Sequence, residues 1–423
     1  MKEKNIFSLV TTAGGMVFLQ AINFLIAILL ARYLTPGEFG KFQLLFTMVT
    51  TLAIITKLGM DEGFIFFIAK IKNYHESTSL LVSYILIFVT VMSISIGLFI
   101  GSQHAFIDQY IISQFDFEYE LKLILFYLPA FVLFTTMASL MRGLERFHVR
   151  ALLTYYLAPL LFLLLIWTYI TYEKSLKLTL VYDFRIYTFL FLSLIGIIFI
   201  FWYLRKNEKK PLRISTIKKY HKLSFALIFI TLIQYMAEQP MIDLLLLSHF
   251  LDANDIGIYA VNYRLAIVPL MVYLAFNVIY ATKLSKLYTS HQYDKLTELF
   301  TLLKKRMLYL SLLLFVCLLL GYDIIILLFG EEYSSGKNVF IILLMGFSFV
   351  SMNGLNGSML IIYEKKKYEF YLNLFFVLIL MFGGYFIVMK FGMVGLAFLN
   401  ALLLFIMVVL RIYYLKNMKV MVK

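Results

Sequence analysis

Long apolar runs follow one another along the chain, and short polar connections separate them. The runs are about 20 residues long, the length that an α-helix needs to cross roughly 30 Å of hydrocarbon. Helices do the spanning, because in lipid each backbone amide must be hydrogen-bonded within its own segment. The pattern predicts about twelve spans, at residues 9–31, 42–69, 80–101, 121–141, 151–172, 186–204, 223–247, 257–281, 307–329, 338–362, 368–389 and 393–415.

The interruption between the first two runs has a copy in the second half of the chain. "LLARYLTPGEFGKF" occupies 29–42 and "LLSHFLDANDIGIY" occupies 246–259, an offset of 217 residues with four identical positions. A weaker echo has an offset of 219, between "SLMRGLERF" at 139–147 and "SMLIIYEKK" at 358–366. An even number of predicted spans separates the copies, so both run through the membrane in the same direction.

This repeat predicts an all-α membrane protein of two six-helix lobes, related by a pseudo-twofold axis along the membrane normal. We expect the N-lobe at 1–204, a basic cytoplasmic linker at 205–222 and the C-lobe at 223–423. Pro36 and Gly37 are expected to turn the chain between the first two spans. Two-lobed repeats are typical of transporters, in which one lobe rocks against the other around a site at their interface.

Composition agrees with a membrane protein. Hydrophobic residues make up 62% of the chain and the mean hydropathy is +0.89, far above the roughly 45–50% apolar content of soluble domains. Placing both termini in the cytoplasm puts most of the 38 Lys and Arg residues on that side, as the positive-inside rule requires. The net charge of +14 then describes a rim that faces anionic headgroups, so no nucleic-acid partner is expected.

Few ionisable residues lie inside the predicted spans, and each is a functional candidate because a charge in hydrocarbon is costly. Lys57 and Asp61 are four residues apart on one helix face, so they can neutralise each other without a substrate. The alternative is that they bind a substrate or ion in a cleft between the lobes. Glu62 lies on a neighbouring face, toward the cytoplasmic half of that cleft.

Asp243 and Arg264 lie at similar depths in the seventh and eighth predicted spans. Two roles fit them. They can form a staple between the two helices, or Arg264 can receive an anionic substrate and rest on Asp243 when the site is empty. The planar fork of arginine suits the second role because it holds phosphate oxygens with two hydrogen bonds.

Glu238 lies near the middle of the membrane, just before Pro240, which bends a helix by removing a hydrogen bond. A polar stripe with Thr231 and Gln234 continues from it, and span 1 has a matching seam at Thr12, Gln20 and Asn23. Such stripes line water between lobes or bind helices to one another. Glu238, Asp61 and Glu62 are the candidates for proton or sodium coupling; a carboxylate bonded permanently to a neighbour is the alternative for Glu238.

Arginines near the predicted membrane ends form the last set of candidates. Arg32 and Arg142 can bind phosphate at the mouths of the cleft, or they can extend to lipid headgroups, as rim arginines commonly do. Arg185 falls just before the sixth predicted span and is assigned to the same rim.

Enzymatic signatures are absent from the sequence. It has no Gly-x-x-x-x-Gly-Lys-Ser/Thr phosphate loop, no metal-ligand spacing among its 6 histidines, and a single cysteine, Cys317, which excludes a disulfide framework. We therefore expect no catalytic residues, no metal and no cofactor.

Four segments of the chain resemble those of a known family. "LLARYLTPGEFGKF", "KLGMDEGFIFFIAK", "LLLLSHFLDANDIGIYAVNYRLA" and "ILLFGEEYSSGKNVFIILLMG", in this order, resemble segments of the polysaccharide translocases. These are the O-antigen, capsule and teichoic acid flippases of the multidrug/oligosaccharidyl-lipid/polysaccharide (MOP) exporter superfamily. The similarity covers essentially the whole chain.

The resemblance implies a V-shaped pair of six-helix bundles in the bacterial cytoplasmic (inner) membrane, like that of the MATE transporters, with spans 1, 2, 7 and 8 around a cationic cavity. The implied substrate is undecaprenyl-diphosphate carrying a short oligosaccharide, turned from the cytoplasmic to the outer leaflet. Membrane lipids, a polymerase and other glycan assembly proteins are the implied partners. By position, the cavity-lining helices carry Gln20, Asn23, Lys57, Glu238, Asp243 and Arg264.

Drug-extruding relatives share the same plan, so a cation-coupled multidrug antiporter is the alternative. A diphosphate needs cations in the cavity, whereas an exporter of cationic drugs favours acidic walls. The charges predicted to lie inside the membrane are two basic (Lys57 and Arg264) and five acidic (Asp61, Glu62, Glu238, Asp243 and Asp323), a count that does not favour the flippase. The preference for a flippase therefore depends on the resemblance and on the arginines near the cavity mouths.

Overall fold

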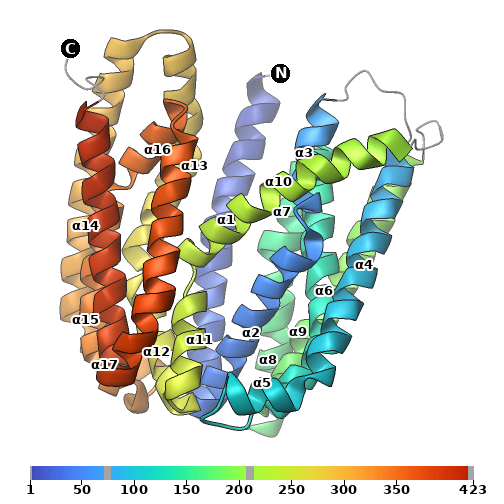
Figure 1. Cartoon of the computed structure of the whole chain (residues 1–423), viewed down its shortest axis with the longest axis vertical. Helices are drawn as coiled ribbons and strands as arrows, with labels where there is room; N and C mark the ends of the chain where they lie inside the picture. Colours follow the sequence, from blue (N-terminus) through green and yellow to red (C-terminus); the bar gives the residue numbers. More distant parts are fainter. Residues whose placement is uncertain (1, 71–77, 206–213, 418–423) are drawn as a thin grey trace. The chain divides into compact units, whose positions relative to one another are not determined.

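The computed structural model describes residues 2–70, 78–205 and 214–417, and the regular structure in these ranges is helical (Figure 1). The all-helical class expected from the apolar runs is confirmed for these residues. Residues 206–213 of the expected linker lie outside the described ranges, and 214–222 form the start of a helix.

Contacts along the chain divide it into two compact units. The first unit contains Met1–Ile26 and Lys41–Tyr235, and the second contains Ala27–Gly40 and Met236–Lys423. The lobe and linker boundaries expected from the sequence stay a prediction.

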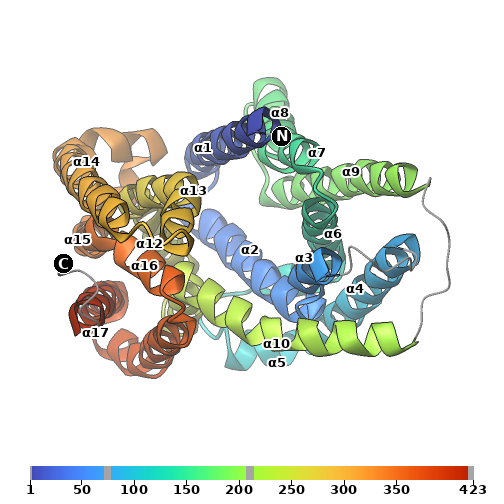
Figure 2. The same ribbon diagram turned by 90° about the horizontal axis from the view of Figure 1, so that it is seen from above.

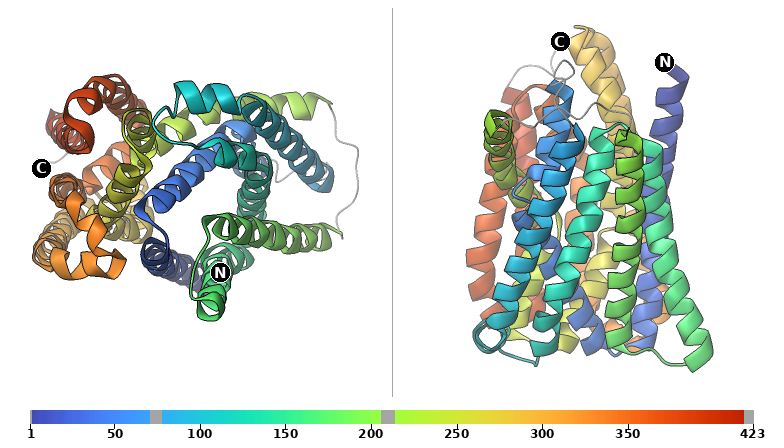
Figure 3. Two further views of the ribbon diagram at one scale, coloured as in Figure 1. Left: turned by 90° about the horizontal axis from the view of Figure 1, so that it is seen from below. Right: turned by 90° about the vertical axis from the view of Figure 1, so that its right-hand side faces the viewer.

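The helices of the first half pack around α6. Contacts join α6 to α3, α4 and α9 (Figures 2 and 3). The close approach of α4 and α6 requires Gly97, because a β-carbon there would lie 2.9 Å from the α-carbon of Leu125. The elements are α1 (Lys2–Tyr33), α2 (Pro36–Lys57), α3 (Met60–Lys70), α4 (Thr78–Ser102), α5 (His104–Tyr110), α6 (Glu118–Gly143), α7 (Phe147–Ala151), the π-helix η1 (Leu152–Leu157), α8 (Ala158–Glu173), α9 (Leu178–Leu204) and α10 (Ile214–Glu238).

In the second half, α15 packs against both α14 and α17. Gly346 permits the contact with α17, since a β-carbon there would lie 2.9 Å from the α-carbon of Ala401. The elements are α11 (Met241–Phe250), α12 (Ala253–Ala266), α13 (Val268–Thr289), α14 (Tyr293–Phe329), the 3-10 helix η2 (Glu331–Gly336), α15 (Lys337–Asn353), α16 (Leu355–Ile362) and α17 (Lys366–Asn417).

α17 is a helical hairpin. Gly392 has φ 58° and ψ −149°, outside the helical region, and the two arms lie side by side (red in Figure 1). Arg411 Nε donates a hydrogen bond of 3.1 Å to Glu369 Oε2, although a straight helix would separate these residues by about 60 Å. The arms match the last two spans expected from the sequence.

The chain is a multi-pass membrane protein. By length and composition, nine helices in the described ranges can cross a membrane, or up to eleven if each of two bent helix pairs forms one span. One such pair is α12 and α13, which meet at 47°. The exact number of twelve spans stays a prediction.

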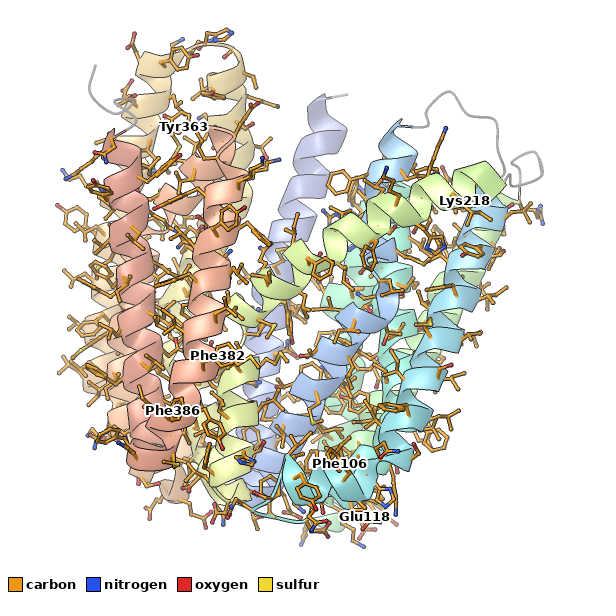
Figure 4. The ribbon with its side chains drawn as sticks, viewed as in Figure 1. Phe106, Glu118, Lys218, Tyr363, Phe382 and Phe386 are labelled. Atoms are coloured by element: carbon orange, nitrogen blue, oxygen red, sulfur yellow. The ribbon has the colours of Figure 1, made fainter. Side chains whose placement is uncertain are left out.

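Large apolar side chains cover the outer faces of these helices. Phe382 and Phe386, one turn apart on α17, point outward and are each 63% exposed (Figure 4). Cys317 is exposed on α14 as well. Such surfaces suit lipid and would be unusual in contact with water.

The first sequence repeat encodes two equivalent helix starts. Thr35 and Glu38 form a capping box at α2, in which Glu38 N donates to Thr35 Oγ1 at 3.3 Å and Thr35 N donates to Glu38 Oε2 at 3.0 Å. At the matching positions of the second copy, Asp255 N donates to Asp252 Oδ1 at 2.9 Å and caps α12. Pro36 is the first residue of α2, so the expectation that Pro36 turns the chain is wrong. The turn precedes it, because proline fits the first position of a helix.

The second, weaker echo encodes two equivalent helix ends. Glu145 after α6 and Glu364 after α16 both adopt positive φ, 58° and 62°. Arg146 N bonds to Met141 O at 2.9 Å, and Lys365 N bonds to Leu360 O at 2.8 Å. All of these residues are related by the offset of 219, so the echo reflects one C-terminal capping geometry used twice.

Candidate functional site

Lys57 and Asp61 form a buried ion pair. Nζ of Lys57 lies 2.5 Å from Oδ2 of Asp61, and the two residues are 8% and 9% exposed. The Asp61 carboxylate also accepts a hydrogen bond of 2.9 Å from the backbone N–H of Glu62, at the start of α3. The mutual neutralisation expected from their spacing is confirmed, and a role for this pair in binding stays a prediction.

A break in the backbone lies between the partners of this ion pair. Leu58 and Gly59 have φ angles of 47° and 70°, so the continuous span expected over 42–69 is divided into α2 and α3. A β-carbon on Gly59 would lie 2.2 Å from the carbonyl oxygen of Ser224 on α10. The positive φ and this close approach explain why glycine is required there.

Glu62 pairs with Arg142 in the first unit. Arg142 Nη1 lies 3.2 Å from Glu62 Oε1, and both side chains are partly exposed. Arg150 interacts electrostatically with both Arg142 and Glu62. Its Cζ lies 5.5 Å from the ring centre of Tyr155. The structure therefore brings Glu62 and Arg142, which the sequence assigned to different roles, into one cluster at the end of α6.

Among the predicted site residues whose side chains the structure describes, Asp243 is the most enclosed, with 1% of its surface exposed. Its Oδ2 accepts hydrogen bonds from the Tyr259 hydroxyl at 3.1 Å and from Asn400 Nδ2 at 2.8 Å. Oδ1 has no hydrogen-bond partner among the described residues. The expected staple to Arg264 is not among these contacts of the described residues, since Tyr259 of α12 and Asn400 of α17 bind one oxygen of the carboxylate only.

Arg264 is half-buried in the last turn of α12, and Asn23 is half-buried on α1; both make contacts. Gln20 on α1 is exposed. Arg32 is exposed, and its Nη1 donates a hydrogen bond of 3.3 Å to the carbonyl oxygen of Leu327 at the end of α14, which fits a rim position.

Two of the sequence candidates have side chains outside the described part of the structure. Glu238 is the last residue of α10, just before the expected break at Pro240, and Thr12 lies early in α1. The polar stripes on spans 1 and 7, and the coupling role of Glu238, therefore stay predictions.

Sequence reasoning misplaced Arg185. The sixth span was expected to begin at residue 186, but α9 begins at Leu178 and carries Arg185 inside it. Its guanidinium lies over three phenylalanine rings of the first unit. The clue in the sequence was the apolar stretch "LTLVY" before Arg185, which lengthens the span.

The partners of Asp243 were also missed. Tyr259 and Asn400 have no special spacing to Asp243, and only the fold brings them together. Asn400 does stand out as a polar residue, 4% exposed, inside an apolar helix arm. Such residues are candidates for interhelical hydrogen bonds.

The described residues contain no group of three or more His, Cys, Asp or Glu side chains that can hold a metal ion. The predicted site residues that they do contain include the Lys57–Asp61 and Glu62–Arg142 ion pairs, a carboxylate with an unused oxygen, and an arginine among aromatic rings. Such groups on membrane helices are candidates for a functional site.

Comparison with solved structures identifies the fold. The chain is similar to the lipid II flippase MurJ in an inward closed conformation, with a TM-score of 0.75 and 14% identity over 98% of this chain and 90% of that one. It is also similar to an inward-facing multidrug resistance MATE family transporter of the MOP superfamily, with a TM-score of 0.65 and 15% identity over 97% and 96% of the two chains. The chain therefore shares the fold of these two proteins.

A third similar structure is a MOP superfamily transporter from Pyrococcus furiosus, described as having a binding pocket of reverse polarity. Its TM-score is 0.59, with 12% identity over 98% of this chain and 95% of that one. No curated protein sequence matches the chain. A family model described as polysaccharide biosynthesis protein matches residues 4–280, and the chain belongs to this family.

Proposed function

We propose that the protein is a flippase that moves an undecaprenyl-diphosphate-linked oligosaccharide, an O-antigen or capsule repeat unit, from the cytoplasmic to the outer leaflet of the bacterial inner membrane. The observation that carries this proposal is the match to the polysaccharide biosynthesis family over residues 4–280. The similarity of fold to a lipid II flippase supports it, since the name of that protein also describes the flipping of a lipid.

Translocation proceeds by alternating access of the two lobes, with both termini in the cytoplasm. Arg264 holds the diphosphate through its two-pronged fork. Arg142 and Arg150, near the end of α6, receive the headgroup first. The polyprenyl tail stays in lipid, because hydrocarbon is the favourable environment for its apolar surface.

The pairing of acidic residues supports a flippase over a drug antiporter. In the described residues Asp61 pairs with Lys57, Glu62 with Arg142 and Asp323 with Lys337, the last at 2.7 Å. Three of the five acidic residues counted from the sequence therefore have basic partners. Acidic walls for a cationic drug would need unpaired carboxylates, whereas an anionic headgroup does not.

Asp243 is the coupling residue that the geometry favours. It is a buried carboxylate whose Oδ1 is unused, and the partners of Oδ2, Tyr259 and Asn400, are neutral. A proton or a sodium ion on Oδ1 would satisfy the oxygen and cancel the charge. By contrast, the sequence candidates Asp61 and Glu62 are already held by bases.

A deletion in the native host tests the proposal. We expect surface polysaccharide to be lost and lipid-linked oligosaccharide to accumulate, and plasmid-borne wild-type protein to restore export. In a host that lacks drug pumps, expression should leave resistance to cationic drugs unchanged. Raised resistance, together with normal polysaccharide after deletion, would favour the cation-coupled multidrug antiporter.

A further inference from the structure

Arg185 is a cation enclosed by aromatic rings inside the first unit. Its Cζ lies 4.5 Å from the ring centre of Phe162, 4.9 Å from that of Phe189 and 5.3 Å from that of Phe46. These rings come from α8, α9 and α2, and each distance is within the range of a cation–π contact. Among the described residues, no carboxylate forms an ion pair with Arg185.

Arg185 lies inside its helix and not at the end of it. α9 begins at Leu178, seven residues before Arg185, whereas Phe189 lies one turn further into the helix. Helical side chains lean toward the N-terminus, and an arginine near a membrane end normally extends to the headgroups. Here three ring contacts hold the guanidinium among the helices of the first unit.

Two polar atoms around the guanidinium have no hydrogen-bond partner. Arg185 Nε and the Tyr127 hydroxyl are both buried without one in the described part of the chain. Tyr127 lies on α6 and is fully buried, and its hydroxyl lies within reach of the Arg185 guanidinium although it makes no hydrogen bond of ordinary geometry. Three aromatic faces stabilise the positive charge, but they accept no conventional N–H hydrogen bonds, so Tyr127 is the one oxygen beside the fork in the described surroundings, and the remaining donors can bind an oxygen ligand.

The charge of this group indicates which oxygen ligand fits. It contains one cation and one neutral hydroxyl, and the other neighbours in contact with the guanidinium are phenylalanines. One guanidinium neutralises a carboxylate and binds it with two parallel hydrogen bonds. A diphosphate carries more than one negative charge and would need further cations, which the described surroundings of Arg185 do not supply.

We propose that Arg185 and Tyr127 form a subsite for the carboxylate of an acidic sugar, so that the transported glycan contains a uronic acid or a similarly charged residue. The inference rests on the proposed function, since it names the class of sugar that the flippase carries. In this role Arg185 is a specificity residue, separate from Arg264, which holds the lipid diphosphate.

Binding to the purified full-length protein in detergent tests the subsite. The probes are sodium glucuronate, glucose and inorganic pyrophosphate at matched ionic strength, and the readout is the ligand-dependent rise in melting temperature, converted to an affinity. We expect glucuronate to stabilise the wild type and glucose to have no such effect. Arg185→Gln should bind glucuronate at least about tenfold more weakly, because it loses charge-assisted hydrogen bonds.

Arg146→Gln is the matched control. Arg146 also lies over an aromatic ring, that of Tyr203 at 3.8 Å, but it is exposed, so this variant should bind glucuronate like the wild type. If Arg185→Gln does not fold, Arg185→Lys keeps the charge and loses the fork, and glucuronate should then bind more weakly than to the wild type. Equal affinity of Arg185→Lys and the wild type would overturn the proposal.

Two further outcomes also overturn it. Stabilisation by pyrophosphate that depends on Arg185, without stabilisation by glucuronate, would assign the group to the diphosphate. If no ligand changes the melting temperature in a way that depends on Arg185, its role is a cation–π contact between helices. The binding assay does not depend on transport, so the two proposals can fail separately. If export is normal but glucuronate does not bind, only the subsite is rejected. If export fails, the measured binding of glucuronate is still valid.

Discussion

Gly40 and Gly257, which occupy the same position in the two copies of the repeated segment, lie against each other's helices in reciprocal contacts. A β-carbon on Gly40 would lie 2.2 Å from the carbonyl oxygen of Ala253, and one on Gly257 would lie 2.0 Å from that of Pro36. Pro36 and Ala253 are themselves matching positions of the repeat. The starts of α2 and α12 therefore cross at two equivalent contacts, each between a glycine of one helix and the backbone of the other. This use of the same contact on both sides explains why the segment occurs in both halves of the chain.

Substitution of Gly40 by alanine is expected to destabilise the protein. The methyl group meets backbone, which cannot move aside like a flexible side chain, so the cost should be at least about 1–3 kcal/mol. The melting temperature of the purified protein measures it. Gly101→Ala is the control, because no atom lies within 4 Å of a β-carbon at Gly101; that variant should match or slightly exceed the wild type. Equal melting temperatures for Gly40→Ala and Gly101→Ala would refute the crossing.

The pair of Lys57 and Asp61 can be tested by removing one partner and then both. Lys57→Met leaves a buried carboxylate without its base, which should cost about 3–5 kcal/mol. The double variant Lys57→Met, Asp61→Leu should recover most of this stability. Lys122→Ala, in an exposed pair with Glu118, is the control and should change stability by less than about 1 kcal/mol.

Export by this double variant separates the two roles of the pair. A stable double variant that exports glycan normally makes the pair structural, and a stable one without export places it in the binding or coupling machinery.

Asp243→Asn should remove the dependence of export on a proton or sodium gradient. The amide keeps the shape of the side chain, but it carries no negative charge that a proton or a sodium ion could neutralise. Transport into vesicles with imposed gradients is the measurement. Asp323→Asn, in an exposed pair with Lys337, is the control and should respond to the gradient like the wild type. An unchanged response in Asp243→Asn would exclude Asp243 from coupling.

Arg264→Ala should abolish glycan export while the protein still inserts in the membrane, because the diphosphate loses its two-pronged partner. Surface polysaccharide and membrane protein levels are measured together. Arg32→Ala should cause a small loss only, since Arg32 is exposed and bonded to a backbone carbonyl. Normal export by well-expressed Arg264→Ala would remove Arg264 from the mechanism.

The sequence was sufficient for features that depend on local chemistry. Apolar runs predicted the helices, since hydrocarbon leaves the backbone no other partner. The spacing of Lys57 and Asp61 predicted their pair. The repeat predicted equivalent elements in both halves, and the two positive-φ residues, Glu145 and Glu364, show that even its weaker copy had structural meaning.

Features that depend on contacts between distant segments were not predicted. The break after Lys57 reflects the approach of Gly59 to Ser224, 165 positions later in the sequence. Asp243 was assigned to Arg264 from depth alone, but Asn400, from the other end of the chain, binds it. The depth of a residue in the membrane can be predicted from the sequence. Which neighbouring helix its side chain faces cannot.

The most direct test of the account is reconstitution of the purified protein in liposomes that contain an undecaprenyl-diphosphate-linked oligosaccharide. A membrane-impermeant reagent that modifies the glycan measures the fraction exposed on the outer leaflet over time. We predict that this fraction rises with time in liposomes with wild-type protein and stays constant in liposomes with Arg264→Ala or without protein. A fraction that is the same with and without the wild-type protein would contradict the assignment as a lipid-linked oligosaccharide flippase.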